Sequence, residues 1–405
     1  MKTTVLALLV LAAITRPSSA QETVAIAGET IYTMAGAPIQ NGIVLVRNGK
    51  IERVGQASAI AVPAGARVIN AKVVTPGLID AHTVVGLAGY LNQPHDQDQL
   101  ERTDAIQPEL RAMDAYNPRE ELVAWLRGFG ITTLHTGHAP AALISGQTMI
   151  VKTRGDTVDD ATIRPEAMIA VTLGEDALGQ NNKSPGTRPK EIAMLRSELI
   201  KAQEHGRKLS SGSEDRRPGR DLGLEMLGKV LRKEMPLLVT ANRSRDILAA
   251  LRVAKEFDIS IILDGAAEAY HVIPQIREAG VPVILHATMA RSNGDRENLS
   301  FETASILRKA GIPVALQSGF ESYVPKTRVV LFEAAIAAAN GLTFVEALST
   351  ITIDAARILG IANRVGSIEP GKDADIALFD GDPFEYTSHV THVLIDGEVV
   401  SEEVR

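Results

Sequence analysis

The chain has 405 residues, of which 45% are hydrophobic, and its formal net charge is -7 at pH 7. This length and composition allow a large buried core, such as one barrel-sized domain with a smaller one attached. The negative charge, without a basic stripe interleaved with aromatic residues, argues against a nucleic-acid partner. The chain has no cysteine, so disulfides and thiolate ligands are excluded, and a metal would have to be bound by histidine or oxygen donors.

The first twenty residues have the pattern of a secretory signal peptide. Lys2 precedes an apolar run from Val5 to Ile14, and the small residues Ser18 and Ala20 follow at the positions that a signal peptidase reads. The run is too short to span a bilayer comfortably, and no later segment approaches the roughly 20 apolar residues of a spanning helix. We therefore expect cleavage after Ala20, a secreted or periplasmic protein and no membrane span.

Both ends of the mature chain have the pattern of β-hairpins. Short β-rich runs alternate with Gly- and Asn-containing turns in "TVAIAGETIYTMAGAPIQNGIVLVRNGKIERVG", and similar runs follow in "GSIEPGKDADIALFDGDPF" and "THVLIDGEVV". Each block alone has too few strands to bury a face. We therefore predict one discontinuous β-domain from residues 21–73 and 361–405.

The middle of the chain, residues 74–360, alternates apolar runs with helical patterns, which indicates β-α units with parallel strands. Gly130, Gly280 and Gly311 stand where helices need a left-handed C-terminal residue before the next strand. With the strand that ends at His82, the runs give seven strands, and an eighth is expected between Gly146 and Gly155. The fold class is therefore α/β, with a (β/α)8 TIM-type barrel as the natural closure, although an open doubly wound sheet also fits the pattern. The other six runs are "ITTLH", "AMIAVTL", "PLLVT", "ISIILD", "VPVILH" and "IPVALQ".

Three motifs of this chain are similar to those of the amidohydrolase superfamily, in particular the imidazolonepropionase-like amidohydrolases. They are "VVTPGLIDAHT", "ANRSRDILAALRVAKEF" and "VGSIEPGKDADIALFDGDP", and they occur in the family's order over nearly the whole mature chain. The resemblance implies a (β/α)8 barrel with a β-sandwich built from both termini. It also implies hydrolysis of non-peptide C–N bonds, with one or two divalent metals at the barrel mouth.

The ligand positions that the resemblance implies are only partly kept. The family uses a His-x-His at strand one, a His at strands five and six, and an Asp at strand eight. Here the first position is His82 and the second is Val84, which has no donor atom; the fifth-strand position is Thr240, a poor ligand. The sixth-strand position falls on Asp264, which could coordinate, and the eighth-strand position falls on Gly319, which has no side chain.

Other polar residues also stand at the predicted strand ends. His82, His135, His286 and Asp264 would give three histidines and one carboxylate, a donor set that suits Zn²⁺ in number. A histidine at a strand end is more often a hydrogen-bonded polar residue than a ligand, and strands two and seven lie far apart across the mouth. We therefore expect a bound divalent metal such as Zn²⁺ to be weak or absent. As a catalytic general base, Asp264 would need a raised pKa. The predicted pocket also includes Thr240, Gln317 and Ser318.

The remaining candidates are weaker. Lys152 could occupy the place of the family's bridging modified lysine, although alternation within a strand explains it equally well. We expect five histidines to lie at the surface: His95, His205, His271, His389 and His392.

Two functions fit these observations. One is an exported hydrolase of small amides or cyclic amides that uses a rearranged metal site around His82 and Asp264. The other is a catalytically inactive barrel that binds a small molecule or acts as a scaffold through the same mouth. The sequence defines neither the substrate nor the oligomeric state.

Overall fold

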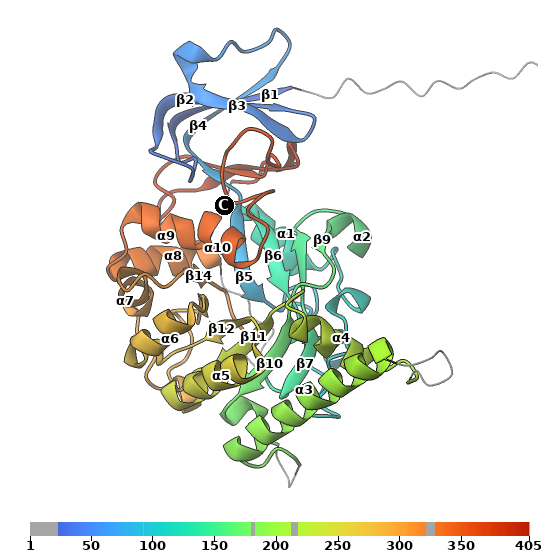
Figure 1. Ribbon diagram of the computed structural model, residues 1–405. Coiled ribbons are helices and arrows are strands. Elements are labelled where there is room, and N and C mark those ends of the chain that lie inside the picture. Colours follow the sequence, from blue (N-terminus) through green and yellow to red (C-terminus); the bar gives the residue numbers. More distant parts are fainter. Residues whose placement is uncertain (1–22, 92, 180–182, 212–217, 321–328, 405) are drawn as a thin grey trace, which may run out of the picture.

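A computed structural model describes residues 23–91, 93–179, 183–211, 218–320 and 329–404. The predicted signal peptide lies outside these residues. Figure 1 shows a sheet that carries both ends of the described chain, and below it a larger body of strands and helices. In the described part, no helix is both long enough and apolar enough to cross a membrane.

Strands from both ends of the chain pair in one seven-stranded sheet, here called the terminal sheet. Its order is β17-β16-β15-β4-β1-β2-β3, and β15 pairs antiparallel with β4 across about 300 residues of sequence. Its apolar face buries Ile26, Val44, Val74 and Ile376. A single sheet is observed rather than two stacked sheets, so the predicted sandwich is not confirmed. The strands are β1 (Val24–Ile31), β2 (Ile39–Arg47), β3 (Lys50–Gln56), β4 (Arg67–Pro76), β15 (Ile376–Phe379), β16 (Val390–Ile395) and β17 (Glu398–Ser401).

The body contains the expected parallel strands. They form a six-stranded sheet of order β14-β13-β12-β11-β10-β7 and a four-stranded sheet of order β5-β6-β8-β9. β10 to β14 run parallel to one another, as do β5 and β6. The strands are β5 (Leu78–Thr83), β6 (Ile131–Thr136), β7 (Ile144–Gln147), β8 (Met149–Lys152), β9 (Thr162–Arg164), β10 (Ile169–Leu173), β11 (Leu237–Ala241), β12 (Ile261–Gly265), β13 (Val283–Leu285) and β14 (Val314–Leu316).

The two sheets surround one interior without a continuous hydrogen-bonded ring. One buried cluster takes Ile79 from β5, Ile150 from β8, Leu238 from β11, Ile262 from β12 and Ile284 from β13. Only a few backbone hydrogen bonds between described residues bridge the seams. Gly319 N donates to His82 O at 3.3 Å at one seam; at the other, Thr148 N donates to Met168 O at 2.9 Å and Ala167 N donates to Thr148 O at 2.8 Å. Regular strand pairing stops at these two seams because β13 and β14 are short and because β7 and β8 run antiparallel to their neighbours. The predicted closed barrel is therefore not seen as such.

Helices follow the parallel strands, as the alternating pattern predicted. The glycines expected at helix ends are confirmed, since Gly130, Gly280 and Gly311 have φ values of 83°, 65° and 79°. The helices are α1 (Glu121–Gly128), α2 (Val158–Ala161), α3 (Arg188–Ser211), α4 (Leu222–Leu231), α5 (Ser244–Phe257), α6 (Ile273–Ala279), α7 (Thr303–Lys309), α8 (Val330–Ala339), α9 (Phe344–Thr350) and α10 (Ile353–Ile358).

Candidate active site at the strand ends

One layer of polar side chains lies directly above the apolar interior. Side chains alternate along a strand, so the residue two positions after an inward-facing residue faces the same interior. Four strands place a polar residue there: Thr240 follows Leu238, Asp264 follows Ile262, His286 follows Ile284, and Gln317 follows Ala315. The carboxyl ends of the parallel strands therefore form the mouth where the sequence placed the site.

His82 and Asp264 form a buried hydrogen-bonded pair within this layer. His82 Nδ1 lies 2.9 Å from Asp264 Oδ1, and the two side chains are only 5% and 3% exposed. Thr240 Oγ1 donates to Asp264 Oδ2 at 2.6 Å, and Gln317 Nε2 donates to Asp264 Oδ1 at 2.8 Å. Asp264 thus accepts hydrogen bonds from three residues, and this fixes the orientation of the His82 ring. His82 Nε2 is buried and has no partner among the described residues.

His82 and Asp264 each stabilise the charged form of the other. Burial lowers the pKa of His82, but the nearby Asp264 carboxylate outweighs burial through its charge and its hydrogen bond, so that pKa lies above its usual value. Burial raises the pKa of Asp264, but the His82 ring, with the Thr240 and Gln317 hydrogen bonds, holds that pKa below its usual value. The raised pKa that would make Asp264 a general base is therefore not found. Asp264 is instead suited to orient His82 and to stabilise its positive charge.

Asp80 and Ser318 support the backbone around His82. Ser318 N donates to Asp80 Oδ1 at 3.0 Å, and Ser318 Oγ donates to Thr83 Oγ1 at 3.1 Å. Burial raises the pKa of Asp80 to about 7, although its hydrogen bonds from Ser318 and His82 oppose the shift. These contacts join the ends of β5 and β14, so Ser318 holds the mouth together.

His135 lies beside His82 but has no free ring nitrogen. The two ring centroids are 5.6 Å apart. His135 Nδ1 lies 2.7 Å from Ala81 O, and Nε2 lies 2.7 Å from Thr148 Oγ1. Burial lowers the pKa of His135 to about 3, and the charge of His82 adds to that effect. At neutral pH, His135 is therefore a neutral ring with both nitrogens engaged in hydrogen bonds to the protein.

A small cavity of about 50 Å³ lies between Asp264 and His286, here called the inner cavity. His286 Nδ1 lies 3.0 Å from Ala287 O, whereas Nε2 is buried without a partner among the described residues. Three further polar residues that the sequence did not suggest, Asp176, Asn242 and Arg296, also line the cavity. Asn242 stands two positions after Thr240, so the alternation of side chains along β11 could have identified it. Asp176 and Arg296 lie in loops that follow strands, and no sequence pattern marks them.

The folded donors do not fit a divalent metal. Within the described ranges, no three histidine or carboxylate side chains are grouped to hold an ion. His82 and Asp264 use their facing atoms on each other, and both nitrogens of His135 are engaged. Val84 packs in an apolar cluster with Ala88 and Ala139, so its position offers no donor. The four expected donors are thus not presented as one ligand set.

Lys152 points away from the mouth. β8 runs antiparallel to β6, so its last residue lies at the opposite end of the strands. There Lys152 Nζ donates to Asp373 Oδ2 at 2.9 Å and to Asp375 Oδ1 at 3.0 Å, next to the terminal sheet. A bridging role for Lys152 at the mouth is therefore excluded by its position.

The five histidines expected at the surface differ among themselves. His95, His271 and His389 are exposed, as predicted, and His392 is half-buried. His205 is only 7% exposed, so the surface prediction is wrong there. It lies on the face of α3 that packs against α4, a contact that the sequence did not reveal.

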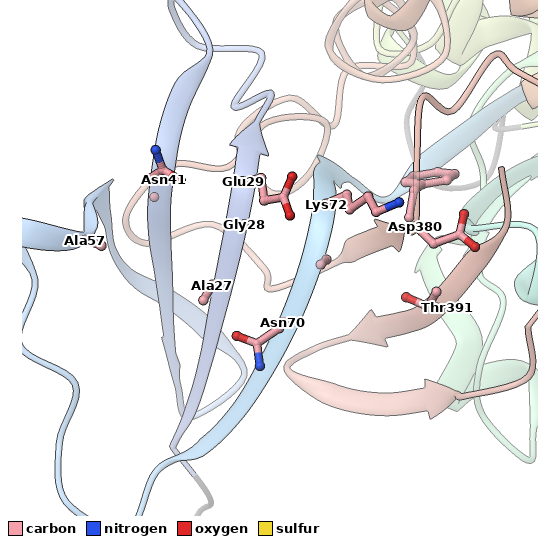
Figure 2. A pocket seen from close by; sticks show the side chains of 12 residues that line it. Ala27, Gly28, Glu29, Asn41, Ala57, Asn70, Lys72, Asp380 and Thr391 are labelled. Carbon is pink, nitrogen blue, oxygen red and sulfur yellow. The ribbon is translucent and has the colours of Figure 1, made fainter.

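A second hollow, of about 450 Å³, lies on the terminal sheet at the far end from the mouth. Figure 2 shows its polar side chains, among them Glu29, Lys72 and Asp380, together with the small residues Ala27 and Gly28. None of its lining residues is a histidine, and none carries a buried polar atom without a partner. The mouth therefore remains the candidate site.

Comparisons with known proteins show which proteins this chain resembles. The chain is 27% identical to the amidohydrolase TasK of Hapsidospora irregularis over 392 residues, which cover 88% of this chain and 39% of TasK. It is 24% identical to the imidazolonepropionase of Mesorhizobium japonicum, over 84% of this chain and 87% of that protein. A crystal structure of an amidohydrolase from Thermotoga maritima superposes with a TM-score of 0.88 at 29% identity, covering 94% of this chain and 100% of that one.

These likenesses define a family and a fold. The chain spans well under half the length of TasK, so the activity of that whole protein is not carried over. The shared fold of the solved amidohydrolases is TIM-barrel-type with mixed α and β content. The sequence model of the amidohydrolase family matches residues 73–400, and the chain therefore belongs to that family.

Proposed function

We propose that this protein hydrolyses a non-peptide C–N bond in a small amide or cyclic amide, with His82 as general base and Asp264 as its orienting partner. The observation that supports this most is the buried 2.9 Å contact between His82 Nδ1 and Asp264 Oδ1 at the strand ends. Family membership supports the reaction class. The proposed site is a rearranged one, because it pairs His82, which stands at the first ligand position of the family, with Asp264, which stands where the family has a histidine.

The pair is suited to move one proton. When His82 is neutral, its Nδ1–H donates to Asp264, so the lone pair on Nε2 can take a proton from water. The water oxygen then forms a bond to the amide carbon, and the positive His82 ring is stabilised by the Asp264 carboxylate. The C–N bond breaks as Nε2 returns the proton to the leaving nitrogen. The products are a carboxylic acid and an amine, and His82 is neutral again.

We also propose that the protein is exported. The support is the pattern of residues 1–20, with Ser18 and Ala20 before the expected cut. N-terminal sequencing of the mature protein tests this proposal.

The hydrolysis proposal is tested with the wild type, His82→Gln and Asp264→Asn on a panel of small amides, cyclic amides and dipeptides. We expect wild-type turnover to persist after dialysis against a chelator, because the step uses only protein side chains. We expect His82→Gln and Asp264→Asn each to lower kcat by about 10²-fold or more, the usual contribution of general base catalysis. His271→Gln, which changes an exposed histidine, is the matched control and should keep wild-type activity.

Two outcomes would contradict the proposal. Turnover that disappears with chelator and returns with Zn²⁺ would show a metal-dependent site instead. No wild-type turnover on the whole panel would overturn hydrolysis and favour the alternative of an inactive barrel that binds a small molecule.

A further inference from the structure

The inner cavity contains buried hydrogen-bonding atoms that the proposed proton transfer does not use. His286 is 4% exposed and Asn242 is 6% exposed, and both line the cavity. His286 Nε2 and Asn242 Oδ1 are each buried without a partner among the described residues. Buried polar atoms are almost always paired, so two unpaired atoms on one cavity indicate a missing ligand group.

The two free atoms are acceptors. Ala287 O can only accept a hydrogen bond, so the proton of the neutral His286 ring must be on Nδ1, 3.0 Å away. Burial lowers the pKa of His286 to about 4, and the positive charge of Arg296 contributes. His286 Nε2 therefore carries a lone pair at neutral pH. Together with Asn242 Oδ1, it can accept N–H or O–H groups of a ligand.

Arg296 offers the complementary donor. Two neighbouring arginines are already bound to carboxylates: Arg188 to Asp246 and Asp295, and Arg243 to Glu268, Asp295 and Glu297. The Arg296 side chain is half-buried on the inner cavity, where its charge interacts with the Asp176 carboxyl group. The structure records no hydrogen bond or ion pair from this side chain to another described residue, so its N–H groups can donate to a ligand. A guanidinium can only donate, so it matches an oxygen of the ligand.

The charges and hydrogen-bonding groups around the inner cavity distinguish three classes of ligand. A cationic amine would satisfy the acceptors and would lie near the Asp176 and Asp264 carboxyl groups, but it has no oxygen to accept a hydrogen bond from Arg296 and would meet the positive charge of that side chain. A carboxylate would satisfy Arg296, but it would bring no N–H to His286 Nε2 and would lie near the Asp176 and Asp264 carboxyl groups. A neutral carboxamide carries an N–H donor and a carbonyl acceptor on adjacent atoms.

We propose that the inner cavity is a carboxamide-recognition subsite, in which His286 Nε2 and Asn242 Oδ1 accept the ligand N–H groups and Arg296 donates to the ligand carbonyl. Its role in catalysis rests on the proposed hydrolysis, whereas its binding preference does not. A volume of about 50 Å³ holds about four water-sized groups, enough for one amide. Asp176 also lines an outer pocket of about 630 Å³, which gives the rest of a larger substrate room to extend.

The test compares three small probes of nearly equal shape: acetamide, acetone, which lacks the N–H groups, and acetate, which is an anion. Binding is followed by saturation-transfer NMR on the full-length mature protein. We expect acetamide to bind at least fivefold more tightly than acetone or acetate. His286→Leu and Arg296→Met should each weaken acetamide binding by about tenfold, the loss expected for one buried hydrogen bond of about 1.4 kcal/mol. His271→Leu and Arg277→Met change exposed residues outside the cavity and should have no effect.

The outcomes separate the two proposals. Acetate bound more tightly than acetamide, or acetamide binding unchanged in both cavity variants, would overturn the subsite even if amides are hydrolysed. The expected binding pattern without any turnover would overturn only the hydrolysis. Arg296→Met keeps the test valid if His286→Leu fails to fold, because Arg296 lies in a surface loop and is half-exposed.

Discussion

At the scale of single residues, the sequence predicted positions better than interactions. The residues expected at the strand ends do lie there: His82, Thr240, Asp264, His286 and Gln317. They could be placed because the two-residue repeat of a strand is visible in the sequence. The sequence could not show that His82 and Asp264 bond to each other, since 182 residues separate them. Nor could it show that both nitrogens of His135 are engaged, because its partners Ala81 O and Thr148 Oγ1 come from other strands.

The His82–Asp264 pair predicts a pH dependence. Because the pKa of His82 is raised above 6.5 in the folded protein, its contribution to stability is fully present below pH 6.5 and is lost as the pH rises through the folded value. In Asp264→Asn, burial remains but the carboxylate is gone. We therefore expect the pKa of His82 to fall below 6.5 in that variant. NMR titration of the ring protons measures both values.

A matched variant gives the control for that titration. Asp258→Asn removes an exposed carboxylate that pairs with Lys233, so it should leave the pKa of His82 raised as in the wild type. A His82 pKa that is unchanged in Asp264→Asn would show that Asp264 does not stabilise the imidazolium, and the orienting role would then be wrong.

At the scale of elements, the helices and parallel strands followed from local pattern. Apolar runs predicted β5, β6 and β10 to β14, and glycines predicted where several helices end. The eighth strand expected between Gly146 and Gly155 is present as β8, but it runs antiparallel to β6 and β9. β7 and β9, with four and three residues, were not predicted because neither contains an apolar run. That local departure separates the inner strands into two sheets, which the sequence did not predict.

The role of the helix-end glycines can be tested with two substitutions that should change the free energy of unfolding in opposite directions. Gly280 and Gly206 both have open space around the position of an added methyl group. Gly280 has a φ of 65°, so Gly280→Ala should lower the free energy of unfolding by about 1 kcal/mol through backbone strain. Gly206 lies inside α3, so Gly206→Ala should raise it by up to about 1 kcal/mol. Chemical unfolding curves measure both, and destabilisation of the same size in both variants would show that strain at Gly280 is not the cause.

At the scale of the whole molecule, a buried ionic cluster joins the inner strands to the terminal sheet. Lys152 comes from β8, whereas Asp373 and Asp375 precede β15 and Asp396 lies between β16 and β17. Lys50 and Arg364 also bind Asp373. Carboxylates from the end of the chain therefore meet a lysine from its middle, which couples the two parts in a way that no local sequence pattern indicates.

Removing the lysine should destabilise both parts together. The side chains of Lys152, Asp373 and Asp375 are 5%, 1% and 2% exposed, so Lys152→Met leaves the buried Asp375 without its cation, whereas Asp373 keeps Lys50 and Arg364. A loss of about 3–5 kcal/mol in the free energy of unfolding is expected for such a broken pair. Trp125 in α1 is the single tryptophan and lies beside Val400 and Ser401 of β17, so its fluorescence reports on the junction of the inner body with the terminal sheet, while circular dichroism reports on all strands and helices. We expect both signals to shift to lower denaturant in one common transition.

The control for this prediction is Lys201→Met, which removes an exposed lysine that pairs with Glu198 on α3. Exposed pairs contribute between about 0 and 1 kcal/mol, so this variant should unfold almost like the wild type. Adding Asp375→Asn to Lys152→Met removes the unpaired charge and should recover part of the lost stability. A Lys152→Met variant no less stable than Lys201→Met, or a tryptophan transition that stays in place while the circular dichroism transition moves, would show that the cluster does not couple the terminal sheet to the barrel-type body.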